Sequence, residues 1–320
     1  MERELSIKSK DFFLVFILPF VFGVSYSLLE LYTGGDQVYY SKFYIQVQEL
    51  AFSQAMLLAP NSLGSGEPVS IFILWLGSYL GFDKSIYISV LNSLLAFFFV
   101  KFSNKEGVPF FITLLLIFNF YFIVLFTGAE RLKIAYVFLC SALFFKGYSR
   151  NLLFVISCLS HLQIFLLLPS FLIYSNYSFL FRLFKYQYLN KKFLMISVAV
   201  ASFSLITFFY LNDVLISKVN AYLNFERSPW QLVQLSLLSI VGVFSSSNYK
   251  RVLFSLLPFF VFVLLLGGGR VNMLAVTFVI GALIIENKIS KPLPVLLLTY
   301  FLLKSFPFIQ NIIEKGNGFA

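Results

Sequence analysis

Long apolar stretches separated by short polar segments run along the whole chain. They recur at eleven places: residues 12–31, 68–81, 86–101, 109–126, 132–145, 151–174, 193–211, 231–244, 252–266, 271–285 and 292–306. A helix that crosses a bilayer needs about 20 predominantly apolar residues, so the pattern predicts an all-α polytopic membrane bundle of about 10–12 membrane segments.

Some of these stretches are short for a full crossing, in particular residues 68–81 and 231–244. Broken or incomplete elements are tolerated at membrane depth only where protein buries them or water lines them. Short segments therefore often border a functional cavity, and we expect some of them to be re-entrant. The stretch at 151–180 is expected to enter and return, with a bend near Pro169.

The composition excludes a soluble protein. Hydrophobic residues make up 59% of the 320 residues, charged residues make up 12%, and the mean hydropathy is +0.88. Soluble domains have about 45–50% apolar and about 25% charged residues. The 43 Phe and 18 Tyr exceed what a compact soluble interior can bury. We expect a single, multi-pass membrane domain over residues 1–320.

The positive charges are concentrated between the apolar stretches. The 24 Lys and Arg against 14 Asp and Glu give a net charge of +10. The positive-inside bias of cytoplasmic loops explains this excess better than a polyanion-binding patch, so nucleic acid is not an expected partner. The segments predicted to be cytoplasmic are the N-terminal region with Lys8 and Lys10 and residues 101–105, 146–150, 182–192, 248–251 and 286–291.

Two long connections are then predicted on the outer side, provided that residues 68–81 do not cross fully. The loop at 32–67 is Gly-rich at both ends and carries aromatic and acidic residues. The loop at 212–230 has apolar residues at i, i+4, i+7 and i+8, a spacing typical of a helix lying on the membrane surface. Those four residues are Leu215, Val219, Tyr222 and Leu223. Shorter outer connections are predicted at 127–131 and 267–270.

Ionisable residues near the outer side are the best candidates for chemistry, because a charge within the bilayer is costly. Asp36 follows a Gly-Gly turn. Glu67 precedes Pro68, where a plain helix-start signal explains it equally well. His161, the single histidine, interrupts an apolar run. Packing is the more frequent role of such a residue, but an imidazole can accept a hydroxyl proton near neutral pH.

Two arginines on the outer side are candidate ligands for an anion. Arg131 and Lys133 begin the stretch at 132–145, where interfacial snorkelling is the alternative role. A guanidinium offers a rigid fork of donors that matches phosphate oxygens. Arg270 follows three glycines. A glycine-rich helix start can bind phosphate, although a tight turn explains the glycines as well.

Other catalytic motifs are missing from the sequence. Without a Walker A motif the chain is not expected to be an ATP-driven pump by itself. Asp occurs only at Asp11, Asp36, Asp83 and Asp213, so no D-x-D supports a metal-bound nucleotide-sugar site. Cys140 and Cys158 lie in apolar runs and suggest neither a disulfide framework nor a metal cluster. With a single His, a catalytic zinc site is not expected, and no cofactor is predicted.

The order of these features resembles the EpsG-like branch of bacterial polysaccharide polymerases, which is related in function to the Wzy O-antigen polymerases. The resemblance is carried by residues 34–44 (GGDQVYYSKFY), residues 66–68 (GEP), Arg131 and residues 160–169 (SHLQIFLLLP). It covers most of the chain as a pattern of spans. In the C-terminal third it depends on hydropathy and on Arg270.

Membership would imply a transferase that joins oligosaccharide repeat units at the outer face of the bacterial inner membrane. An undecaprenyl-diphosphate-linked chain is then the donor, and a second lipid-linked unit supplies the acceptor hydroxyl. Our hypothesis assigns Arg131 and Arg270 to the donor diphosphate. It leaves Glu67, Asp36 and His161 as alternatives for the group that orients or deprotonates the acceptor. Metal-independent transfer is expected, since the leaving group is already a diphosphate.

Further substrate contacts are expected in the outer region, from Tyr40, Tyr44, Lys133 and Arg227, although interfacial anchoring is the more frequent role of such aromatic residues. Membrane lipid and a chain-length regulator are further candidate partners. Two alternatives stay open: a flippase or transporter of the same lipid-linked oligosaccharide, and a transferase similar to an O-antigen ligase. The absence of repeat-related halves from the sequence favours the polymerase over the transporter.

Overall fold

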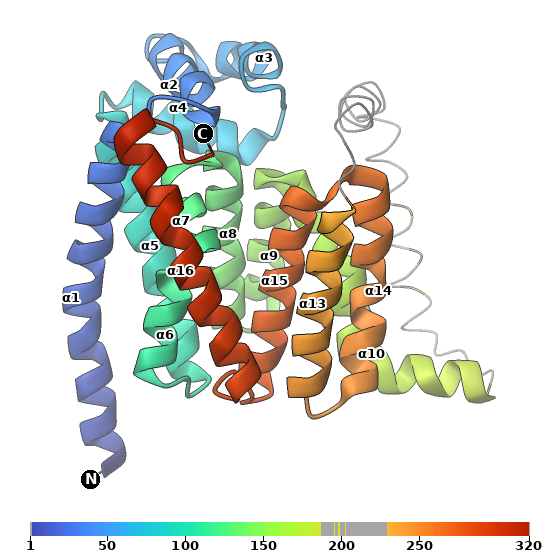
Figure 1. Ribbon diagram of the computed structural model, residues 1–320. Helices are drawn as coiled ribbons and strands as arrows, with labels where there is room; N and C mark the ends of the chain where they lie inside the picture. Colours follow the sequence, from blue (N-terminus) through green and yellow to red (C-terminus); the bar gives the residue numbers. More distant parts are fainter. Residues whose placement is uncertain (1, 187–194, 196–197, 199–201, 203–228, 320) are drawn as a thin grey trace. The chain divides into compact units, whose positions relative to one another are not determined.

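The computed structural model describes residues 2–186, 195, 198, 202 and 229–319. Every regular element in these residues is a helix, so the predicted all-α membrane bundle is confirmed (Figure 1). The predicted stretch at 193–211 lies almost entirely outside the described residues. The same holds for the loop at 212–230 with its expected amphipathic helix, and Arg227 and Tyr222 fall in that part.

Within the described part of the chain, six segments are long and apolar enough to cross a membrane. One of them runs from Leu162 to Phe181, through the 3-10 helix η1 (Leu162–Leu166) into α10 (Leu167–Tyr186). The others lie in α1 (Glu2–Leu31), α5 (Lys84–Lys105), α14 (Tyr249–Leu266), α15 (Gly268–Ile285) and α16 (Pro292–Lys315). The chain is therefore a multi-pass membrane protein.

The stretch at 109–126 forms two helices in place of one. α6 (Phe110–Ile117) and α7 (Phe120–Thr127) are bent by 49° and pass as a seventh span if they are counted together. Asn119 begins α7, where its side-chain oxygen accepts hydrogen bonds from Tyr121 N at 2.8 Å and Phe122 N at 3.2 Å. An asparagine at this position caps a helix, because it satisfies backbone donors that have no intrahelical partner.

The two stretches that are short for a crossing form short apolar helices, α4 (Pro68–Tyr79) and α13 (Trp230–Ser245). The bend predicted near Pro169 is located elsewhere. α9 (Gly147–Ser160) ends before His161, whose backbone is extended, and η1 follows. Pro169 is the third residue of α10. A proline disturbs the first turn of a helix little, because its missing N–H has no partner there.

The described helices fall into two compact units, a division that no change in composition marks. The first comprises Met1–Ile164 and Asn287–Ala320, and the second comprises Phe165–Glu286. In the first unit α1 packs along α5, and α8 (Glu130–Phe144) packs on α5 and α9. α8 and α9 form a helical hairpin, which the hydrogen bond from Ser157 Oγ to Ala135 O at 2.7 Å holds together.

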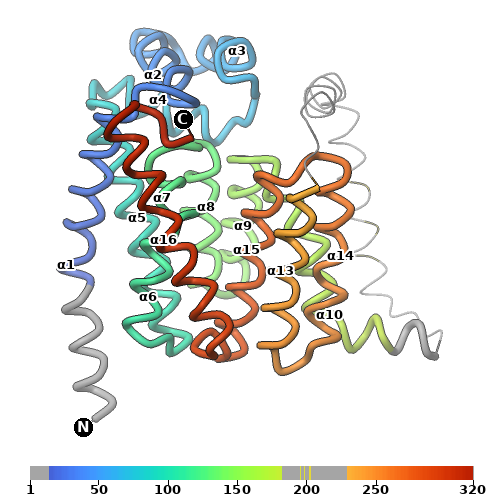
Figure 2. Tube along the Cα trace, in the orientation of Figure 1, coloured from blue at the N-terminus to red at the C-terminus, as the bar shows by residue number. Residues whose placement is uncertain are grey.

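The predicted loop at 32–67 contains two helices, α2 (Asp36–Gln46) and α3 (Phe52–Leu63). Together with α4 they gather at one end of the first unit (Figures 1 and 2). The end of α16 lies at the same place, since Gly34 N donates a hydrogen bond to Gly316 O at 2.8 Å. Phe43, Ile71 and Ile88 form the centre of a fully buried apolar core beneath these helices.

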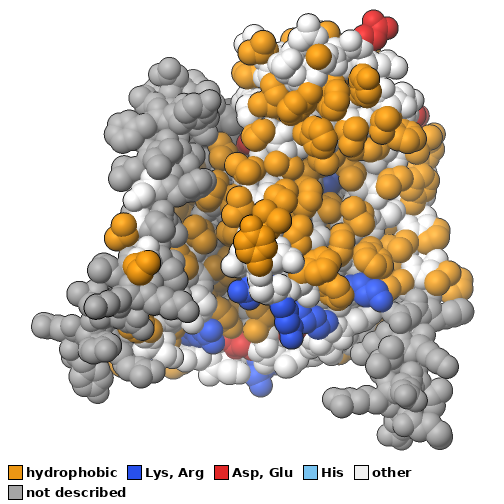
Figure 3. Space-filling view, turned by 180° about the vertical axis from the view of Figure 1, so that it is seen from behind, with side chains coloured by type: hydrophobic (Ala, Val, Ile, Leu, Met, Phe, Trp, Pro, Cys, Tyr) orange, Lys and Arg blue, Asp and Glu red, His pale blue; other side chains and the backbone are white. Residues whose placement is uncertain are grey.

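Basic residues mark the opposite end of the first unit. Lys105, at the end of α5, donates hydrogen bonds to Leu143 O at 3.1 Å and Phe144 O at 3.3 Å at the end of α8. The segments at 101–105 and 146–150 therefore share one end, as the charge pattern requires. Hydrophobic side chains cover most of the visible described surface, with Lys and Arg toward its lower margin (Figure 3). Which side of the membrane each end faces stays a prediction.

The second unit is built from α10, α13, α14 and α15. Glu286 holds part of it together, because its carboxylate accepts hydrogen bonds from Tyr174 Oη at 2.9 Å and Ser246 Oγ at 2.8 Å. The Arg251 guanidinium lies 3.8 Å from the centre of the Tyr174 ring, and its Nε donates to Tyr174 O at 2.6 Å. These contacts give the basic segment at 248–251 a packing role within the unit.

Candidate functional site

Glu67 begins α4 but does not cap it with its side chain. The first turn of α4 forms through the backbone, since Ile71 N donates to Glu67 O at 3.2 Å, and Ser70 Oγ donates to the same oxygen at 3.2 Å. The Glu67 side chain is only 3% exposed, so its carboxylate lies inside the protein. A plain helix-start signal therefore does not account for this residue.

The Glu67 carboxylate contacts two other predicted site residues at once. Arg131 Nη1 donates to Glu67 Oε2 at 2.5 Å. His161 Nδ1 lies 2.9 Å from Glu67 Oε1, and Leu162 N donates to the same oxygen at 3.5 Å. Ser65 donates its hydroxyl to Oε2. We call Glu67, Arg131, His161, Tyr40 and Ser65 the Glu67 cluster.

Arg131 reaches this cluster from the first turn of α8. Its Nε donates to Tyr40 Oη at 3.2 Å, and the described residues provide no hydrogen-bond partner for its Nη2. The turn that starts α8 places Ala129 at φ 51°, a left-handed conformation that is uncommon for a residue with a side chain. Strained backbone of this kind is found disproportionately at functional sites. Arg131 is 8% exposed, so its charge is largely shielded from solvent.

The environment keeps the Glu67 carboxyl ionised. Burial alone would raise the pKa of Glu67. The hydrogen bond and charge of His161, the charge of Arg131 and the Ser65 hydroxyl outweigh burial and hold the pKa below its usual range. A carboxylate with a lowered pKa is a weak base at neutral pH. Glu67 is therefore better suited to holding its two partners than to removing a proton.

His161 is the better placed base. Its Nδ1 faces the Glu67 carboxylate and donates to it, so that in the neutral form of the ring Nε2 is the nitrogen that can accept a proton. Nε2 lies 3.1 Å from the Gln163 side-chain oxygen. Gln163 is partly exposed, and Nε2 points toward it.

A second buried polar cluster lies beside the first and is centred on Gln37. Gln37 Nε2 donates to Glu130 Oε1 and to Thr127 O, both at 2.7 Å. Lys133 Nζ donates to Glu130 Oε2 at 2.7 Å, and Lys84 donates to Gln37 Oε1. We call Gln37, Glu130, Lys133 and Lys84 the Gln37 cluster. Buried charges require partners of this kind, because an unpaired ion inside a protein is strongly destabilising.

The structure corrects the expected role of Lys133. Its side chain has 0% exposure, and Nζ is held by Glu130 and, at 3.2 Å, by Phe126 O. Lys133 therefore belongs to the Gln37 cluster and not to the Glu67 cluster, and its ammonium group is enclosed by protein partners. Tyr44 is also buried, and its hydroxyl donates to Phe82 O at 3.1 Å. Of the two predicted tyrosines, Tyr40 is the one that contacts the Glu67 cluster.

The other predicted site residues lie outside the Glu67 cluster. Asp36 is the exposed first residue of α2. Arg270 is exposed on α15 and belongs to the second unit. Of the three glycines before Arg270, Gly268 serves a close packing contact, because a Cβ there would lie 2.3 Å from Gln231 Cβ. Gly268 N donates to Gln231 Oε1 at 2.5 Å, so this amide already has a protein partner.

Sequence reasoning missed three polar residues that support the two clusters: Gln37, Ser65 and Lys84. The signal for Gln37 was present. Gln37, Tyr40, Ser41 and Tyr44 follow the i, i+3, i+4, i+7 spacing of one helix face, but that face is polar and reads as a loop.

Within the described residues, no group of three or more His, Cys, Asp or Glu side chains is arranged to hold a metal ion. The sequence matches no protein-family model and no curated protein, and the structure matches no solved structure. The resemblance to the EpsG-like polymerases therefore stays a prediction.

Proposed function

We propose that this protein is a membrane glycosyltransferase that joins undecaprenyl-diphosphate-linked oligosaccharide repeat units at the outer face of the bacterial inner membrane. The observation that carries the proposal is the Glu67 cluster. Three residues chosen separately from the sequence, Glu67, Arg131 and His161, meet within hydrogen-bond distance although they lie 64 and 94 residues apart from Glu67 along the chain.

The three groups suit transfer to a hydroxyl from a diphosphate leaving group. The acceptor oxygen attacks the anomeric carbon of the donor, and the bond from that carbon to the diphosphate oxygen breaks with its electron pair. The hydroxyl proton moves to His161 Nε2. Arg131 stabilises the negative charge that develops on the diphosphate, since a guanidinium in a shielded site is worth more than one in water.

In this mechanism Glu67 is a positioning residue. It fixes Arg131 through one carboxylate oxygen and His161 through the other. Its negative charge also stabilises the imidazolium that forms once His161 accepts the proton, as the buried carboxylate does in serine hydrolases. Tyr40 orients the guanidinium from its other side through Nε.

The test is polymer length in a strain that lacks the gene, complemented with variants at equal protein level. Arg131→Ala and Arg131→Lys are expected to reduce polymer formation about 100-fold or more, in line with the loss of one group that stabilises transition-state charge. Arg150→Ala is the matched control, since Arg150 is exposed on α9 near the basic end of the same unit. Normal polymer from both Arg131 variants would contradict the mechanism.

The lipid-linked glycans of the deletion strain distinguish the three candidate functions. Accumulation of single repeat units outside the membrane supports the polymerase. Accumulation inside the membrane indicates the flippase, and polymer of normal length that remains on its carrier indicates the ligase-like transferase.

A further inference from the structure

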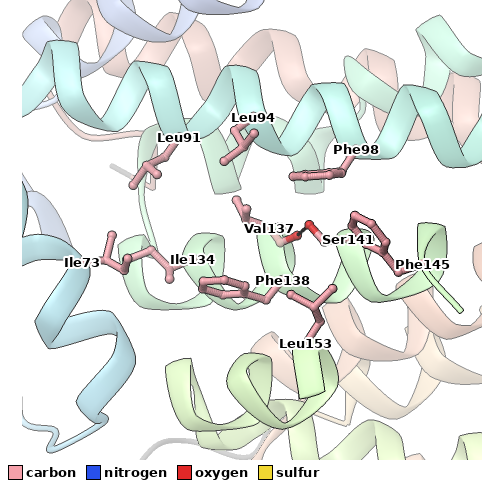
Figure 4. Close-up of a pocket in the computed structure, with 10 residues that line it drawn as sticks. All are labelled: Ile73, Leu91, Leu94, Phe98, Ile134, Val137, Phe138, Ser141, Phe145 and Leu153. Atoms are coloured by element: carbon pink, nitrogen blue, oxygen red, sulfur yellow. Dashed lines mark hydrogen bonds between the residues drawn. The ribbon is translucent and has the colours of Figure 1, made fainter. Parts of the chain in front are cut away.

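An apolar pocket of about 310 Å³ lies within the first unit, among α4, α5, α8 and α9 (Figure 4). Aliphatic and aromatic side chains line it. The one polar lining residue is Ser141, whose hydroxyl donates to Val137 O at 2.7 Å and so is already satisfied. An apolar cavity without polar partners holds no ordered water and favours a hydrocarbon, as a cavity of about 150 Å³ does when it binds benzene.

The pocket runs lengthwise along the helix face that carries Arg131. Ile134 and Phe138 line it and follow Arg131 at i+3 and i+7, which places all three on one side of α8, and Phe145 lines the pocket directly after the helix ends. At 1.5 Å per residue, the part from Ile134 to Phe145 extends over roughly 16 Å. This face of α8 therefore has the Glu67 cluster at one end and apolar side chains along the rest of its length.

α9 also contributes to the pocket through Leu153, which lies about two helical turns before the end of the helix at Ser160. The pocket also reaches the surface, since Leu94 and Phe145 are 38% and 43% exposed. A lipid chain could therefore enter this pocket from the side, with the polar head group of the lipid toward Arg131 and His161.

We propose that this pocket binds the hydrocarbon chain of a polyprenyl diphosphate, with the diphosphate at Arg131. The proposal rests on the proposed function and adds where the lipid part of the substrate lies. The volume of the pocket is at the lower end of the roughly 300–1,000 Å³ typical of ligand pockets, so it accommodates part of one hydrocarbon chain. Arg131 Nη2 is available for the phosphate oxygens.

The test is photolabelling of the full-length protein in nanodiscs of phosphatidylethanolamine and phosphatidylglycerol. The probe is a polyprenyl diphosphate with a diazirine on its chain, and labelled peptides are identified by mass spectrometry. The expected labels lie on the lining of the pocket, at residues 73, 91–98, 134–145 and 153. Leu153→Trp fills part of the pocket and is expected to reduce labelling about tenfold, which corresponds to the loss of burial for about two methylene groups of the probe chain. Leu152→Trp is the matched control, because Leu152 is adjacent, 46% exposed and not part of the lining.

Two results would overturn this inference: labels confined to other helices, or competition by unlabelled phosphatidylglycerol as strong as that by unlabelled polyprenyl diphosphate. Equal labelling of the Leu153→Trp and Leu152→Trp variants would do the same. These readouts do not depend on polymer formation. Failure of the proposed function would be seen as normal polymer from the Arg131 variants, and failure of the lipid site would be seen in the labelling pattern, so the two failures are distinguishable.

Discussion

Replacement of Lys133 by Met is expected to destabilise the protein strongly. Both side chains of the Glu130–Lys133 pair have 0% exposure, with Nζ and Oε2 2.7 Å apart. Met fills a similar volume but leaves the Glu130 carboxylate inside the protein with Gln37 as its remaining hydrogen-bond partner. Removal of one member of a buried ion pair costs about 3–5 kcal/mol of the free energy of unfolding.

A double variant separates lost packing from unpaired charge. Glu130→Gln combined with Lys133→Met places neutral side chains of similar size at both positions, so no buried charge is left without a partner. We expect this double variant to be more stable than Lys133→Met alone. The coupling free energy of the two residues should then be about 0.5–3 kcal/mol, the range found for residues in direct contact.

The assay is reversible unfolding in mixed micelles, followed by the fluorescence of Trp75, which packs near the apolar core of the first unit. Lys146→Met is the control, because Lys146 is exposed and its replacement is expected to change the free energy of unfolding by less than about 0.5 kcal/mol. A Lys133→Met variant as stable as this control would refute the reasoning. So would the loss of polymer from a stably folded double variant, since Lys133 would then take part in the reaction.

Three further predictions concern single residues. In the wild type, the folded-state pKa of Glu67 lies below its ordinary 4.5, so the stabilisation from the ionised carboxylate is present above about pH 4.5 and is lost as the pH falls. Glu67→Gln removes this titrating group, so the variant should lose less stability than the wild type between about pH 6 and pH 3. Parallel pH dependences of the two unfolding free energies would contradict this prediction. Gly77→Ala places a Cβ 2.5 Å from the Tyr87 ring and should cost about 1–3 kcal/mol in the same unfolding assay, whereas Gly23→Ala, with open space around it, should not destabilise α1. Asn119→Ala removes the cap of α7 and should lower the melting temperature at a cost of about 0.5–2 kcal/mol, with the neutral capping residue in Asn119→Ser restoring part of it.

The long spans were predictable because the thickness of the bilayer imposes a minimum length on an apolar run. The helices inside the loop at 32–67 were not, because α2 turns polar and aromatic residues inward and so lacks an apolar face. The break between α6 and α7 is also invisible in hydropathy, since Asn119 is one polar residue within a long apolar run. The break at His161 was assigned to Pro169 because proline is the stronger signal for a helix end.

The site could be predicted residue by residue but not as an arrangement. Glu67, Arg131 and His161 were each recognisable as costly ionisable groups beside apolar runs. Their contact depends on how the α8–α9 hairpin meets the start of α4, and no local pattern encodes that packing. The choice of base needed the same information. Only the structure reveals that the Glu67 carboxylate is already occupied by Arg131, His161 and Ser65.

α2 connects the two buried clusters through adjacent turns. Gln37 bonds to Glu130, and Tyr40 bonds to Arg131, so two consecutive residues of α8 are matched by two positions of α2. A substitution at one position of either pair removes one hydrogen bond from its buried partner. Among related chains, we therefore expect residues 37 and 130 to change together, and likewise residues 40 and 131. Divergence in this region of the family would then proceed by paired replacements rather than by single ones.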